Sequence, residues 1–317
     1  MHDYKYGAIA WTALRDRTWN LKDFRSECLR PIALAFLTNL TRTSRFALMP
    51  AHLALLARND QLWRDYIDTT LGRSINPESK KYSPREFSNQ EVELIRPLLE
   101  KYSGLPDSES KELIQNVGIA FVEDNLKRDN DMRESMTAVL STIVLESWTA
   151  FEMLASDLWV AAINKGPREL ASRVMMSKRW LKSDDQLTPE KVYHLEHDPR
   201  TQLGSFLLEI GRVSFSKLNY ILRYYSDAFG KDVEEVFEEV EGGYIFALSA
   251  FRNALIHNAG KTDKHFVNRI ARFSEFRSIV PNEVLMLDGE VVRKLHNSAI
   301  VLGWKLIGFV DDVLTPR

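Results

Sequence analysis

The sequence predicts an all-α protein. Long stretches place apolar residues at helical spacing, and glycine and proline are scarce, at 14 and 11 of the 317 residues. The hydrophobic content of 44% is enough to bury a full core, so a disordered chain is not expected. The length indicates about two domains.

The first 130 residues are predicted to be helical but interrupted. Residues 30–40 form one expected helix, and residues 50–72 form a second that opens at Pro50, a residue favoured in the first turn. The polar stretch 73–90 contains two prolines and is predicted to be a surface loop or linker. Two more helices are expected at 91–102 and 110–126.

The remaining residues predict a second set of helices. The longest runs from 132 to 164 and is stopped by Gly166 and Pro167. A polar, partly basic stretch of short helices and loops follows. Later segments comprise a helical pair over 203–229 that ends at Gly230, an acidic exposed helical face over 231–242, a helix over 243–257, and a last helix over 289–314 capped by Asp288.

Charge and cysteine content limit the function classes. The formal net charge is −2, so any nucleic-acid contact must come from a local basic patch. Cys28 is the single cysteine, which excludes an internal disulfide and a cysteine-based zinc site. The N-terminus shows no secretion signal, and the apolar run 299–310 is too short to cross a bilayer. We therefore expect a cytoplasmic protein without a membrane partner.

The helix over 243–257 carries polar residues where a core face is expected. At about 100° per residue, Arg252 falls on the stripe of Ile245, Leu248, Leu255 and Ala259. A second, polar stripe with four-residue spacing contains Ser249, Asn253 and His257. An arginine keeps its charge in proteins, so burying it requires a partner or an anionic ligand.

The long helix offers a partner for Arg252. Glu152 interrupts the apolar stripe formed by Leu145, Trp148, Ala155 and Trp159. Opposite charges on two core-like faces predict that the helices meet at a Glu152–Arg252 pair. Either the pair is a buried structural ion pair, or it belongs to a functional site.

His257 and the residues after it also allow two interpretations. A histidine at a helix end commonly caps the last carbonyls, and Gly260 fits a helix terminus. The segment 261–277 adds a local positive excess, with phenylalanines that would stack on bases if exposed and otherwise belong to the core. Its candidate RNA-binding residues are Lys261, Lys264, Arg269 and Arg272.

The residues Arg252–His257 match R-N-x-x-x-H, the signature of HEPN-superfamily ribonucleases. Residues 144–160 resemble the early HEPN helix whose acidic residue faces the motif, and Glu152 matches that acidic position. Residues 203–230 and 283–314 resemble the middle helices and the closing helix of family members. The resemblance covers roughly 132–317 and departs from the compact family core at 165–204.

The resemblance implies an organisation. It predicts a HEPN-like antiparallel helical bundle over 131–317 with an insertion around 165–204. An additional helical region of unknown role, 1–130, precedes it. It also implies a homodimer whose two motifs meet at one cleft.

The resemblance also implies a function. That function is cleavage of RNA without a metal or other cofactor, leaving a 2′,3′-cyclic phosphate. His257 would act as general acid or base, Arg252 would bind the phosphate, Asn253 would orient either, and Glu152 would position Arg252. Family members commonly act as bacterial toxins or in antiviral defence, so an antidote or regulatory protein is a further expected partner.

Other interpretations stay open. A non-catalytic helical module would bind RNA or a protein partner through the same groove, and residues 1–130 would in another case restrain the nuclease. Histidines and acids at 194–198 are compatible with metal binding, but they lack the H-E-x-x-H arrangement, and a solvated turn is favoured. Five residues along a helix separate Arg252 from His257 by roughly 140°. One regular helix therefore cannot aim both into one cleft.

Overall fold

The computed structural model is all-α throughout the residues that it describes, which confirms the predicted class. The described residues are 24–70, 125–165, 202–209, 213–239 and 243–315, with isolated positions 6, 21, 93, 119, 120, 122, 123, 170, 173 and 174; side chains at 52, 55–70 and 239 are not described. The helices are α2 (Leu29–Thr70), α5 (Asn130–Lys165), α8 (Leu203–Glu209), α9 (Leu218–Phe229), α10 (Asp232–Glu239), α11 (Tyr244–His257), α12 (Lys264–Ile270), the 3₁₀ turn η5 (Ser274–Phe276) and α13 (Gly289–Leu314).

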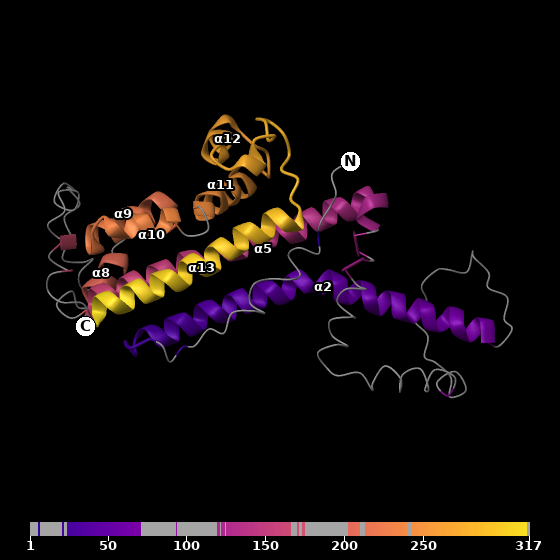
Figure 1. Ribbon diagram of the computed structural model, residues 1–317, viewed down its shortest axis with the longest axis horizontal. Coiled ribbons are helices and arrows are strands. Elements are labelled where there is room, and N and C mark those ends of the chain that lie inside the picture. The colour runs from indigo at the N-terminus through magenta and orange to yellow at the C-terminus, as the bar shows by residue number, and fades with distance from the viewer. Residues whose placement is uncertain are drawn as a thin grey trace, which may run out of the picture.

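Three long helices form the body of the molecule. Helices α5 and α13 lie together along its centre, α2 lies on one side of them, and α8 to α12 lie on the other (Figure 1). The described ends of the bundle are tied by Asp311 of α13, whose carboxylate accepts hydrogen bonds from the main-chain N–H groups of Arg25 (3.0 Å) and Ser26 (2.7 Å). These bonds fix the residues directly before α2 against the end of α13.

Cross-helix contacts define the directions of the long helices. His296 of α13 bonds Ser147 of α5 at 2.7 Å, and about two turns further on Gly303 meets Leu154, so α5 and α13 run parallel. Helix α2 runs the opposite way, because Ser26 meets Asp311 whereas Ser44 meets His296. The two long helices of the bundle predicted over 131–317, α5 and α13, are therefore parallel, and their antiparallel neighbour α2 belongs to the preceding region 1–130.

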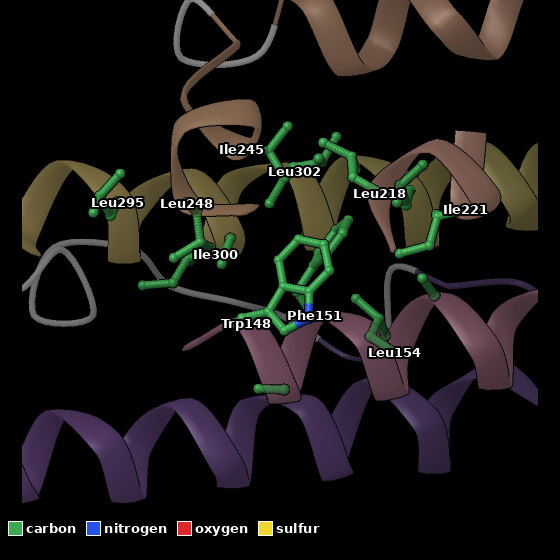
Figure 2. Close-up of a cluster of buried hydrophobic side chains, with 14 of the residues drawn as sticks. Trp148, Phe151, Leu154, Leu218, Ile221, Ile245, Leu248, Leu295, Ile300 and Leu302 are labelled. Carbon is green, nitrogen blue, oxygen red and sulfur yellow. The ribbon is translucent and has the colours of Figure 1, made fainter. Parts of the chain in front are cut away.

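The core lies where these helices converge. Figure 2 shows Trp148, Phe151 and Leu154 of α5 beneath residues of α9, α11 and α13. Buried residues of α2, including Leu29, belong to the same continuous cluster. Helix α5 is apolar and long enough to cross a membrane by length and composition alone, and its apolar window is 50% buried inside the protein. The core helix of a soluble protein meets the same criteria, so this is weak evidence for a membrane.

Two predicted boundaries in α2 are wrong: the helix expected to end at residue 40 continues, and no new helix begins at Pro50. Pro50 was expected to begin a helix, but it lies inside the continuous helix α2. Proline there removes the main-chain bond to the carbonyl four residues earlier and commonly bends a helix; Figure 1 shows α2 changing direction along its length. Ala47 and Ala51, both fully buried, pack against the core on either side of Pro50 and keep the chain helical through it.

Several predicted boundaries are confirmed. Helix α9 ends at Gly230, whose φ of 96° favours glycine, and α13 begins with the Asp288 side chain accepting from Val291 N at 2.8 Å. Helix α10 exposes Asp232, Glu234, Glu235 and Glu238, and it buries Val233 and Phe237. The predicted loop at 73–90, the helix at 91–102 except residue 93, most of the insertion at 165–204 and the histidines at 194–198 lie outside the described residues.

Candidate active site

Helix α11 carries the R-N-x-x-x-H residues, and Arg272 secures its start. Gly243 precedes the helix in a left-handed conformation (φ 73°), and a Cβ there would overlap the Arg272 guanidinium. That guanidinium donates to Gly243 O at 3.0 Å and to Glu238 of α10 at 2.9 Å. It also lies 4.4 Å from the ring centre of Phe246. Arg272 thus connects α10, α11 and the segment after α12.

The end of α11 is a tight turn immediately after His257. The carbonyl of Ala254 accepts from both Asn258 N and Gly260 N, each at 3.1 Å. Ala259 and Gly260 both have positive φ, of 49° and 76°. Leu285 N then donates to Gly260 O at 2.8 Å, so the turn is attached to the extended segment before α13. These contacts fix the position of His257 at the last helical residue.

The burial pattern of α11 differs in part from the predicted stripes. Ile245 and Leu248 are buried as expected, but Leu255 is half-buried and Ala259 is exposed. Ser249, assigned to the polar stripe, is only 2% exposed. Helix α11 is covered on several sides near its start because it packs against α5, α12 and α13, and it emerges from the core towards its end. The motif therefore lies where the helix leaves the interior.

Glu152 and Arg252 lie on facing helices but do not form the predicted direct ion pair. The Glu152 carboxylate accepts from the Trp148 indole at 2.8 Å, one turn earlier on α5. Arg252, half-buried, donates to the side-chain oxygen of its neighbour Asn253 at 3.0 Å. The two side chains still sense one another electrostatically. The hydrogen bonds of Glu152 and Arg252 are thus formed within their own helices, and the two charges interact only electrostatically between α5 and α11.

The pKa of Glu152 reflects this setting. Partial burial raises the pKa of the carboxyl group above its usual value. The Trp148 hydrogen bond and the Arg252 charge both lower that pKa, because each stabilises the ionised form, but burial outweighs them. A raised carboxyl pKa close to a charged motif residue is a feature of functional sites as well as of structural networks.

His257 is exposed and does not cap α11. Its imidazole makes no hydrogen bond to any residue within the described ranges, and Asn258 is the residue that follows the helix. The side chain of Asn258 donates instead to Asp263 at 3.1 Å, and the other oxygen of Asp263 caps α12 by accepting from Phe266 N at 2.6 Å. These bonds lower the pKa of Asp263. His257 is therefore free to meet a ligand or a second chain.

The predicted RNA-binding residues differ in availability. Lys261 and Lys264 are exposed, directly after the turn that follows His257. Arg269 is half-buried on α12. Arg272 is already bonded to Glu238 and Gly243, so of the four it is the least available to a phosphate. The structure thus favours the two lysines as the phosphate contacts nearest the motif.

The phenylalanines of the basic segment belong to the core. Phe266, Phe273 and Phe276 are each at most 5% exposed. Phe251 of α11 packs between Phe266 and Phe276, with ring centres 5.1 and 5.2 Å away. Stacking on bases is therefore not their role. They attach α12 and η5 to α11 and so set the basic residues beside the motif.

The arrangement brings together a cation with spare donors, an amide, a carboxylate and an exposed imidazole. The sequence identified these four residues, but it missed Trp148, whose four-residue spacing from Glu152 was the available signal. No cluster of His, Cys, Asp and Glu side chains suited to a metal ion occurs in the part of the chain that the structure covers. A scan against protein-family models, a search of curated proteins and a search of solved structures found no match to this chain.

Proposed function

We propose that this protein is a metal-independent endoribonuclease. The observation that carries the proposal is the end of α11, where Arg252 and Asn253 are bonded to each other beside Glu152 and an exposed His257 follows one turn later. Exposed Lys261 and Lys264 add positive charge to the same end of the helix. The resemblance of the motif to HEPN ribonucleases supports the same reaction.

The chemistry uses groups that α11 supplies. The ribose 2′-hydroxyl attacks the adjacent phosphate, the bond to the 5′-oxygen breaks, and the products are a 2′,3′-cyclic phosphate and a 5′-hydroxyl. His257 moves the proton, since an imidazole side chain is the usual general acid or base in enzymes. The planar, permanent charge of Arg252 binds the phosphate and the negative charge that develops on it. Asn253 fixes one edge of that guanidinium.

A homodimer is part of the proposal. Helix α11 stays regular through His257 and breaks only afterwards, so Arg252 and His257 diverge by roughly 140° around its axis. One chain does not aim both groups at the same phosphate. Two copies that meet at their α11 ends would supply an arginine from one subunit and a histidine from the other.

The proposal is tested by incubating purified protein with total RNA. We expect His257→Ala to lower cleavage by about 100-fold or more, the usual effect of removing a general acid or base. His265→Ala, which removes an exposed histidine on α12, is the matched control and should cleave normally. Cleavage should continue in EDTA and should be absent with DNA, which lacks the 2′-hydroxyl. Equal cleavage by wild type and His257→Ala would refute the mechanism.

A second candidate is a non-catalytic module that binds RNA or a protein through the same face. It is favoured by three exposed apolar side chains near the end of α11, on Ile256, Val284 and Met286. Binding without cleavage by wild type, unaffected by His257→Ala, would support this alternative.

For the nuclease, we propose a cytoplasmic role as a toxin or antiviral effector with a regulatory protein or antidote. Expression in cells tests this role: wild type should arrest growth, and His257→Ala should not.

A further inference from the structure

Trp148 joins the core to the candidate site. Its side chain is 1% exposed and lies in the central cluster of Figure 2. The indole N–H is its single donor, and it points to Glu152 at 2.8 Å. Because a buried ring of this size has little freedom to rotate, it fixes the carboxylate on the α5 side of the helix contact.

The position of the carboxylate determines which Arg252 donors are available. A guanidinium has five N–H donors arranged as a fork that matches a carboxylate or a phosphate. Among the described residues, Asn253 accepts one of these bonds and Glu152 accepts none. A direct bidentate pair with Glu152 would occupy the edge of the guanidinium that a phosphate would use.

We infer that Trp148 is a positioning residue that holds the Glu152 carboxylate away from Arg252 and so leaves the guanidinium available for an RNA phosphate. The phosphate ligand rests on the proposed function, whereas the positioning of Glu152 does not. The Trp148 hydrogen bond also offsets part of the rise in the pKa of Glu152 that burial causes, so it favours the ionised carboxylate in this position. Loss of the indole N–H would let the carboxylate turn and pair with Arg252.

The first test is independent of RNA and uses NMR of side-chain N–H groups. In wild type, the Trp148 indole signal should move with pH as Glu152 titrates, and in Glu152→Gln that movement should be lost. In Trp148→Phe, the Arg252 guanidinium signals should shift and exchange more slowly as the new ion pair forms. The double variant Trp148→Phe/Glu152→Gln should restore the wild-type positions. If the Trp148 indole signal of wild type does not move as Glu152 titrates, the inference is overturned, even if Trp148→Phe fails to fold.

The second test measures binding of a fluorescent 2′-O-methyl oligouridylate, which lacks the attacking hydroxyl. Trp148→Phe should weaken binding by about tenfold, as expected when one charge-assisted bond to a phosphate is lost. Adding Glu152→Gln should restore most of the affinity, an effect that mere loss of packing would not produce. Trp159→Phe is the matched control. Trp159 lies on α5 like Trp148, but its buried indole donates to the main-chain oxygen of Tyr224 on α9 at 3.0 Å and does not bond Glu152.

The outcomes separate the two proposals. Weaker binding by Trp148→Phe without rescue by Glu152→Gln would overturn the role of Trp148 and leave the nuclease proposal standing. Wild type that fails to bind the oligonucleotide, with the NMR signals behaving as expected, would refute the RNA function and retain the positioning of Glu152. Equal weakening by Trp159→Phe and Trp148→Phe would also overturn the inference, because it would show a general packing effect.

Discussion

His296 should make the stability of the bundle depend on pH. Its ring is 1% exposed and lies between α2, α5 and α13. Ser147 donates its own hydroxyl proton to Ile143 O at 2.6 Å, so it accepts from His296 Nδ1–H at 2.7 Å. The other ring nitrogen faces Ser44 at 3.4 Å. Burial disfavours the charged ring and lowers the pKa of His296 from 6.5 to about 4.

The sign and the size follow from linkage. Between pH 6.5 and pH 4 the unfolded chain binds a proton at this histidine and the folded chain does not, so the free energy of unfolding falls as the pH falls. Above pH 6.5 both states are neutral and the full stability is present. From pH 7.5 to pH 4.5, the expected loss from this one group is about 2.5 kcal/mol, at about 1.36 kcal/mol per unit.

Urea unfolding of wild type and His296→Gln at pH 7.5 and pH 4.5 measures this loss. Glutamine does not titrate, and both serines keep their main-chain acceptors in the variant. The fall in unfolding free energy should therefore be about 2.5 kcal/mol smaller in His296→Gln than in wild type. His265→Gln, at an exposed position, should behave as wild type. Parallel pH profiles for wild type and His296→Gln would refute the assignment of the loss to the buried ring.

Substitutions at Gly204, Asp288 and Asp311, with controls, test other contacts by thermal or urea unfolding. Gly204→Ala should destabilise by about 1–3 kcal/mol, because its Cβ would lie 2.7 Å from Val160 O, whereas Gly308→Ala meets nothing within 4 Å and should be neutral or stabilising. Asp288→Ala should lose about 1 kcal/mol with the cap of α13, and Asp288→Asn should retain most of it. Asp311→Asn should lose about 1–3 kcal/mol, because an amide has one acceptor oxygen where the carboxylate uses two; an unchanged midpoint would contradict that role.

The sequence predicted best the helix ends that depend on local chemistry. Gly230 and Asp288 act within one turn of their own helices, so their meaning does not depend on distant residues. The helix start predicted from Pro50 was wrong, although it rested on the same kind of local evidence. A proline at a first turn and a proline inside a helix look alike locally, and burial of Ala47 and Ala51 decided between them. That burial depends on α5 and α13, which the local sequence does not reveal.

At the candidate site, too, features set by local sequence were predicted and features set by distant contacts were not. Helical spacing correctly placed Glu152 among the buried residues Trp148, Ala155 and Trp159, and it put Arg252 on a helix that packs against α5. It did not predict which groups bond. The indole of Trp148, one turn earlier on α5, takes the hydrogen bond of the Glu152 carboxylate, whereas Arg252 of α11 affects that carboxylate only through its charge. Arg272 was assigned to RNA because it lies in a basic segment. Its bonds to Glu238 and Gly243 join residues far apart in the chain, so they cannot be predicted from local sequence.

The position of α2 constrains any regulatory role for residues 1–130. Helix α2 packs against α5 and α13 on the side away from α11, so it does not cover the motif (Figure 1). Its buried residues complete the same core, and removing everything before residue 131 would expose that face of α5 rather than cleanly release a site. Restraint by the described part of α2 would therefore have to pass through α5 or α13, because each of them contacts both α2 and α11. Ser147 of α5 bonds His296 of α13, whose other ring nitrogen lies 3.4 Å from Ser44 of α2. Glu152 lies five positions after Ser147 and interacts electrostatically with Arg252, so a shift of α5 is one physical route by which the N-terminal region would alter the motif.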